Sequence, residues 1–198
     1  MAGAVLLALN KPAATLPAFM SGKPFTSFIQ VADFFLLGLF LILGIKFKNL
    51  VISVLSLVQI AMLSYFEFVM LKGGHGPPPG LFCDNLSVIM VLLISIAGSL
   101  IILYALPYMD NHEHHLHLKK SRQPRFFALL FLFIGAMNTL VLTNDLMLFY
   151  FCFEITTLCS FLLIGHDRTV QAIKNSLTAL WINSLGGLAL LAGMMLIY

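Results

Sequence analysis

The chain has 198 residues, of which 60% are hydrophobic and only 10% are charged, and its formal net charge is +3. A soluble domain has about 25% charged residues, so this composition excludes a water-soluble globular protein and indicates an integral membrane protein. The small, scattered positive charge does not indicate a nucleic-acid partner. Cys83, Cys152 and Cys159 form no CxxC pair and are interpreted as small buried hydrophobic residues.

Residues 1–24 form a separate N-terminal segment in the sequence pattern. Its first ten residues are apolar, but ten residues are too few to span a bilayer. The first basic residue, Lys11, follows the apolar part, which is the wrong order for a cleaved signal peptide. We therefore interpret the segment as an interfacial anchor or half of a helix.

The rest of the chain, residues 25–198, is predicted to form an all-α transmembrane bundle of about six helices. Each span needs about 20 apolar residues, and the sequence offers six such stretches: 25–45, 50–71, 86–109, 126–142, 146–164 and 172–198. A short basic turn, a run of three prolines, the long polar loop 110–125 and two tight turns separate them. The turn at 143–145 also supplies capping residues for the fifth helix.

The basic residues predict the orientation of these spans. Eight lysines and arginines fall on one side of the predicted bundle and three on the other. The larger set is Lys46, Lys48, Lys119, Lys120, Arg122, Arg125, Arg168 and Lys174, and the smaller set is Lys11, Lys23 and Lys72. Because basic loops stay in the cytoplasm, we expect a multi-pass protein of the cytoplasmic membrane with both termini outside.

Glu154 lies near the middle of the fifth predicted span. A charged residue at the bilayer centre costs about 2.5–3.5 kcal/mol on insertion scales, so such residues are usually functional. A carboxyl group whose cationic neighbour approaches and retreats takes up and releases a proton, which is the elementary step of a pump. The alternative is a protonated acid that only joins neighbouring helices by a hydrogen bond.

Other polar residues in the spans extend this hypothesis. Tyr150 and Thr157 lie at i−4 and i+3 from Glu154, on the same face of the helix. Asn138 and Asn183 lie deep in the fourth and sixth spans and are candidates for a longer polar path. Lys174 is the candidate cation, although the helical rise places it too far from Glu154 for direct contact, so water or a further group would have to bridge them. The alternative is an ordinary lysine that extends its charge toward the membrane surface.

The remaining polar residues give weaker signals. Asp33 and Glu67 are placed nearer the ends of their spans. The histidines within 112–117 have no ordered ligand spacing, and no metal site is predicted from them. No phosphate-binding loop or nucleophile arrangement is present in the sequence, so no catalytic chemistry and no bound cofactor are expected in this chain itself.

Three motifs resemble the antiporter-like membrane subunits. That family comprises the proton-pumping subunits of complex I, the large subunits of Mrp antiporters and their counterparts in energy-converting [NiFe] hydrogenases. Residues 146–165, "LMLFYFCFEITTLCSFLLIG", resemble the fifth helix of these subunits, with Phe153 in place of the family's tryptophan. Residues 83–90, "CDNLSVIM", and 171–187, "QAIKNSLTALWINSLGG", resemble the starts of its third and sixth helices. The sequences of these motifs are most similar to those of the hydrogenase branch.

The resemblance implies specific roles and partners. By resemblance, Glu154 is the proton-path glutamate and Lys174 is the lysine that opens the sixth helix. The family's glutamate pairs with a lysine on a broken seventh helix, so a partner chain or segment is expected to complete the repeat. The resemblance further implies other membrane subunits and peripheral hydrogenase or dehydrogenase subunits, which would hold a nickel–iron centre and iron–sulfur clusters.

We therefore interpret the chain as a membrane subunit of a redox-driven proton or sodium pump, within a membrane-bound oxidoreductase. Two alternatives are kept. One is a stand-alone homo-oligomeric membrane transporter, which needs no oxidoreductase partner. The other is a structural assembly subunit without an ion path of its own, for which Glu154→Gln would leave pumping intact.

Overall fold

The structure, a computed structural model, describes residues 23–70, 84–115 and 122–197. Within these ranges the chain forms α2 (Lys23–Lys46), α3 (Leu50–Tyr65), the π-helical segment η1 (Phe66–Met70), α4 (Asn85–His115), α5 (Gln123–Leu142), α6 (Leu146–Ile164) and α7 (Val170–Ile197). Among the described residues, six helices are long and apolar enough to cross a membrane. The predicted all-α membrane fold with six spans is thus confirmed.

Some predicted boundaries are wrong. The loop expected at 110–125 is shorter, because α4 continues to His115 and α5 already begins at Gln123. A helix needs no apolar side chains for its backbone hydrogen bonds, so it can continue into polar sequence. Pro124 stands in the first turn of α5, where its missing N–H is tolerated. The predicted N-terminal segment 1–24 lies outside the described residues except for residues 23 and 24, which begin α2. The run of three prolines and Cys83 also lie outside the described residues.

Side-chain caps fix where several helices begin. The Asn49 side chain accepts a hydrogen bond of 3.2 Å from the N–H of Val51 at the start of α3. The Asp145 side chain accepts one of 2.9 Å from the N–H of Met147 at the start of α6, as expected for a capping residue in the turn at 143–145. Each cap pairs one of the N–H groups that the first helical turn leaves unsatisfied.

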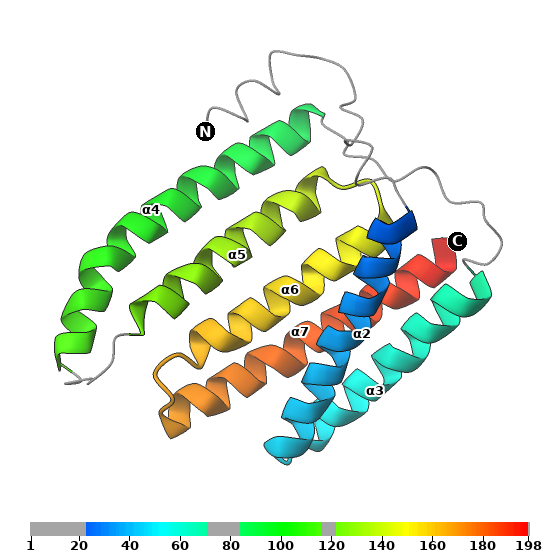
Figure 1. Ribbon diagram of the computed structural model, residues 1–198, viewed down its shortest axis with the longest axis horizontal. Helices are drawn as coiled ribbons and strands as arrows, with labels where there is room; N and C mark the ends of the chain where they lie inside the picture. Colours follow the sequence, from blue (N-terminus) through cyan, green and yellow to red (C-terminus); the bar gives the residue numbers. More distant parts are fainter. Residues whose placement is uncertain (1–22, 71–83, 116–121, 198) are drawn as a thin grey trace.

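Four of the helices form a bundle, and the other two form a hairpin on one side of it. Helix α6 packs against α2, α5 and α7, and α3 packs against α2 and α7. Helix α4 packs against α5 at the edge (Figure 1). Helix α2 begins at the same end of the bundle at which α7 ends. Helix α6 is therefore the most enclosed helix, which suits a buried site.

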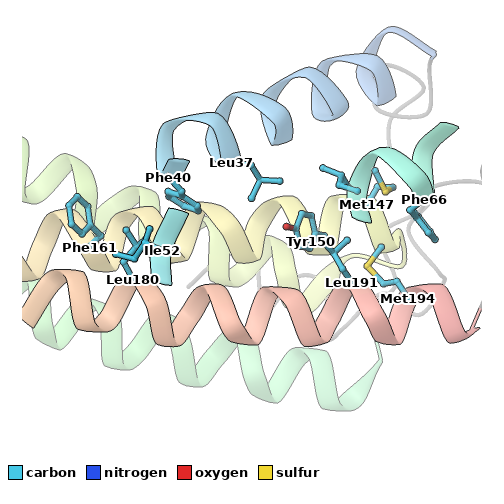
Figure 2. Packing of buried hydrophobic residues seen from close by; sticks show 11 residues of the cluster. Leu37, Phe40, Ile52, Phe66, Met147, Tyr150, Phe161, Leu180, Leu191 and Met194 are labelled. Carbon is cyan, nitrogen blue, oxygen red and sulfur yellow. The ribbon is translucent and has the colours of Figure 1, made fainter. Parts of the chain in front are cut away.

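The apolar core of the four-helix bundle has two layers. Figure 2 shows Phe40, Ile52, Phe161 and Leu180 gathered in one layer, and Phe66, Met147, Leu191 and Met194 in the other. Leu37 and Tyr150 lie between these layers. Most of these side chains are fully buried, and none is more than 8% exposed. The space between the layers is enclosed at both ends by apolar side chains.

Candidate functional site

The polar centre of the protein lies between the two apolar layers. Gln59 stands midway along α3 between Ile52 and Phe66, seven residues from each. Glu154 has the same spacing from Met147 and Phe161 on α6, and Gly187 has it from Leu180 and Met194 on α7. Three neighbouring helices therefore bring Gln59, Glu154 and Gly187 to the same height.

Gln59 and Glu154 are joined by a hydrogen bond. Both side chains are fully buried. The Gln59 amide Nε2 donates to Glu154 Oε1 at 3.0 Å, and it lies 3.4 Å from the hydroxyl oxygen of Tyr150. Glu154 Oε2 and Gln59 Oε1 have no partner among the described residues. One oxygen of the acid is thus held by Gln59, the Tyr150 hydroxyl lies close to the carboxyl group, and Oε2 has no hydrogen-bond partner among the described residues.

Gly187 makes room for this contact. A Cβ atom at Gly187 would lie 2.6 Å from Gln59 Nε2 and 2.6 Å from Glu154 Oε1, which is closer than real Cβ atoms approach. Any larger residue at this position would therefore push the two side chains away. The pair lies directly against the backbone of α7, so three helices define its position.

Further buried polar groups surround this centre. Asp33 on α2 is fully buried, and neither of its carboxyl oxygens has a partner among the described residues. Ser56 on α3 and Ser184 on α7 are also fully buried, and their hydroxyl groups have no partner in the same part of the chain. Oxygen atoms without fixed partners are costly to bury in an apolar interior, and they attract protons, water or cations.

The predicted residues on α6 face this centre. Tyr150 is fully buried and Thr157 is 1% exposed, so both lie on the same enclosed face as Glu154. The Thr157 hydroxyl donates to the backbone oxygen of Phe153 at 3.1 Å, one turn earlier. The tyrosine hydroxyl is near the site's amide, whereas the threonine hydroxyl is occupied by its own helix.

The other predicted residues lie away from the centre. Lys174 is exposed near the start of α7. Asn138 on α5 and Asn183 on α7 are half-buried, and the hydrogen bonds of the described residues join neither of them to Glu154. The buried polar side chains of α7 are Ser176 and Ser184, and Ser184 directly follows Asn183. The helical turn rotates Asn183 off the buried face.

Sequence reasoning missed Gln59 and underrated Asp33. Gln59 follows Ser56 by three residues and precedes Leu63 by four, and all three are buried on one face of α3. The amide of Gln59 within an apolar span could have indicated this contact, because amide side chains form hydrogen bonds between membrane helices. Asp33 was assigned to the end of its span, but it is fully buried.

The arrangement fits proton transfer better than metal chemistry. In the ranges 23–70, 84–115 and 122–197 no group of three histidine, cysteine or acidic side chains is placed to hold a metal ion. The histidine-rich segment is not part of that statement, because its side chains lie outside the described part. A buried carboxyl with one hydrogen-bonded oxygen and one free oxygen can accept a proton and pass it on.

Two family models match the chain. The family described as NADH-ubiquinone oxidoreductase (complex I), chain 5 N-terminus, matches residues 73–127. The family described as NADH:quinone oxidoreductase/Mrp antiporter, transmembrane region, matches residues 143–198, which include Glu154.

Curated relatives agree with these families. The chain is 38% identical over 118 residues to a Na(+)/H(+) antiporter subunit A1 of Staphylococcus haemolyticus, and 37% identical over 118 residues to the protein of the same name in Staphylococcus aureus strain Newman. Each alignment covers 59% of this chain but only 14% of the relative. No solved structure matches significantly. With its six apolar helices, the chain belongs to the antiporter-like membrane subunit family and matches the N-terminal part of that family.

Proposed function

We propose that this chain moves protons within the membrane as one subunit of a larger ion-translocating assembly, with Glu154 as the proton carrier. The observation behind the proposal is the contact of Glu154 with Gln59 between two apolar layers. The acid is fully buried, yet one of its oxygens has no partner among the described side chains. A group that only fastened two helices together would not need that second oxygen to be free.

Different observations support the proposed ion exchange and the proposed energy source of the assembly. The relatives are named as Na(+)/H(+) antiporter subunits, which supports an exchange of sodium for protons. The motifs "ITTLCS" and "LWINSLGG" resemble the hydrogenase branch, which supports a redox-driven pump. In that setting the nickel–iron centre and the iron–sulfur clusters belong to hydrogenase subunits, or in a complex I-like assembly to dehydrogenase subunits.

Lys174 is proposed to act on Glu154 from a distance. It is exposed near the start of α7, while Glu154 lies at the middle of α6, so water or a group of another chain has to connect them. A second polypeptide that completes the antiporter-like repeat would supply such a group. The basic loops are proposed to face the cytoplasm, with both termini outside.

The first experiment identifies the assembly. The full chain is purified with an affinity tag from its own membranes in mild detergent, and the copurifying proteins are identified by mass spectrometry. We expect further membrane subunits and either peripheral oxidoreductase subunits or further antiporter subunits. A homo-oligomer of this chain alone would instead support the stand-alone transporter.

The second experiment tests the role of Glu154. The purified assembly is reconstituted into vesicles that contain a pH-sensitive dye, and proton flux is started with a sodium gradient or with an electron donor. We expect Glu154→Gln to abolish the flux while assembly is retained. Asp145→Asn is the matched control, because it also removes one acid from this helix region but keeps the capping oxygen. Unchanged flux in Glu154→Gln would leave the structural assembly role.

A further inference from the structure

We propose that Asp33 is a second proton-carrying residue, and that Asp33 and Glu67 connect Glu154 to the end of the bundle where α3 and α7 finish. This inference rests on the proposed function of Glu154 and adds the direction in which its proton travels. It concerns only α2, α3, η1 and α6.

Asp33 is buried without a hydrogen-bond partner among the described residues. Its carboxyl group is fully buried, and no described residue donates a hydrogen bond to either oxygen. A buried ionised carboxylate without donors is strongly disfavoured, so the group needs a proton or water molecules in place. Asp33 thus differs from Glu154, one of whose oxygens accepts a hydrogen bond from Gln59.

The residues one turn before and one turn after Asp33 indicate its height in the bundle. Ile29, one turn before Asp33, packs against Leu148 and Cys152 of α6. Leu37, one turn after it, belongs to the main core cluster. Helices α2 and α6 run in the same sense (Figure 1). Asp33 therefore faces α6 one turn beyond Ile29, which brings it toward the level of Glu154.

Asp33 lies within electrostatic range of two other acids, Glu154 and Glu67. It also lies within electrostatic range of Tyr150 and Cys152 of α6. This agrees with the packing of Ile29 against Leu148 and Cys152. Two neighbouring carboxylates repel each other, so Asp33 and Glu154 favour a state in which at least one proton is shared between them.

Glu67 follows Gln59 in the direction of the end of the bundle where α3 finishes. It lies in η1, eight residues after Gln59, which is about 12 Å along the helix axis at 1.5 Å per residue. Its side chain is 8% exposed, and its Oε1 has no partner among the described residues. π-Helical turns occur frequently at functional sites. Glu67 thus stands between the interior acids and the end of the bundle.

The proposed transfer moves one proton along these three acids. The protonated Glu67 gives its proton to the Asp33 carboxylate through water, and Asp33 then gives a proton to the Glu154 carboxylate, again through water. Each step breaks one O–H bond and forms another, so no electron or further reactant is needed. The reverse sequence releases a proton at the end of the bundle, on the side that the basic residues predict to be outside.

The test uses the intact assembly in vesicles. Asp33→Asn is expected to lower the proton flux by about tenfold or more, Asp33→Glu to restore part of it, and Glu67→Gln to lower it less. Asp145→Asn is the control with unchanged flux. If Glu154→Gln stops the flux and Asp33→Asn does not, the inference is wrong and the proposed function stands. If Glu154→Gln leaves the flux intact, the proposed function itself fails.

Infrared difference spectroscopy provides a readout that does not depend on flux. The carbonyl stretch of protonated carboxylic acids is recorded during a change of pH in the wild-type assembly and in both Asp33 variants. We expect one carbonyl band to disappear in Asp33→Asn, and the same band to shift in Glu154→Gln, because its charged neighbour is gone. A wild-type spectrum whose bands are the same in Asp33→Asn would overturn the inference. If Asp33→Asn does not assemble, Asp33→Glu is used instead. A shifted carbonyl band in that variant supports the inference, and an unchanged spectrum overturns it.

Discussion

The amide of Gln59 donates a hydrogen bond of 3.0 Å to Glu154, so an acid of α6 is held by a side chain of α3, 95 positions earlier in the sequence. Both groups are fully buried. The contact therefore couples the position of the acid to the packing of α3 against the rest of the bundle. A shift of either helix would therefore change the position or the hydrogen bond of the Glu154 carboxyl group.

Replacing Gln59 by leucine removes this donor while keeping a side chain of similar size. We expect a loss of about 1–2 kcal/mol of stability, because hydrogen bonds between membrane helices are modest and an unpaired buried group adds a penalty. Thermal unfolding of the purified assembly measures the loss. Tyr150→Phe is the matched control and should cost less, because its hydroxyl lies 3.4 Å from the amide. An equal loss in both variants would contradict this view of the site.

Replacing Gly187 by alanine places a methyl group in the contact between the two side chains. Its Cβ would lie 2.6 Å from the donor nitrogen and from the acceptor oxygen, so the pair must move apart. Overpacking of this kind costs about 1–3 kcal/mol, and we also expect proton flux to fall. Gly193→Ala on the same helix is the control, since its Cβ meets nothing within 4 Å. Comparable behaviour of the two variants in flux and thermal unfolding would argue against a tight site.

The sequence was sufficient for the fold and for the acid at the centre of the site. Six apolar stretches of bilayer length predict six helices, because the backbone in lipid must satisfy its own hydrogen bonds. Glu154 stands out because a lone acid in such a stretch is costly. Both inferences depend on local sequence and need no knowledge of which helices touch.

The partners of the acid could not be predicted in the same way. Gln59 meets Glu154 only because α3 and α6 both pack against α7 and α2, and that choice of neighbours is a property of the whole bundle. Asp33 was judged by its distance from the predicted end of its span, whereas its burial depends on α6 packing against α2. For the same reason the sequence led to Asn183 on α7, whereas the fully buried side chain is that of the next residue, Ser184. A shift of one residue turns a side chain to another face of the helix.

The cap of α6 gives a prediction about the element that positions Glu154. Asp145 accepts a hydrogen bond of 2.9 Å from the N–H of Met147. Asp145→Ala removes the acceptor, and loss of such a cap costs about 0.5–2 kcal/mol. Asp145→Asn keeps an acceptor oxygen and should stay near the wild-type melting temperature. If the asparagine variant is as unstable as the alanine variant, the charge of Asp145 and not its capping oxygen stabilises the helix.

The start of α4 should depend on pH in a defined direction. The backbone N–H of Ser87 donates to Asp84 at 2.7 Å, and this hydrogen bond holds the pKa of the Asp84 carboxyl below its usual range. Since the folded pKa is lower than the unfolded value of about 3.9, the cap stabilises the helix at neutral pH. That contribution is lost as the pH falls from the unfolded value through the folded pKa.

Amide hydrogen exchange at Ser87 and Val88 measures this effect directly, because both N–H groups lie in the first turn of α4. We expect protection to fall as the solution is acidified below the usual pKa of an aspartate. Asp84→Asn keeps a capping oxygen without a titrating group, so its protection should stay constant over the same range. Since Asp84 is fully exposed at the surface, only the first turn should respond, and the exchange of residues around Glu154 should be unchanged. A loss of protection at both places would mean that acid acts on the bundle as a whole and not on this cap.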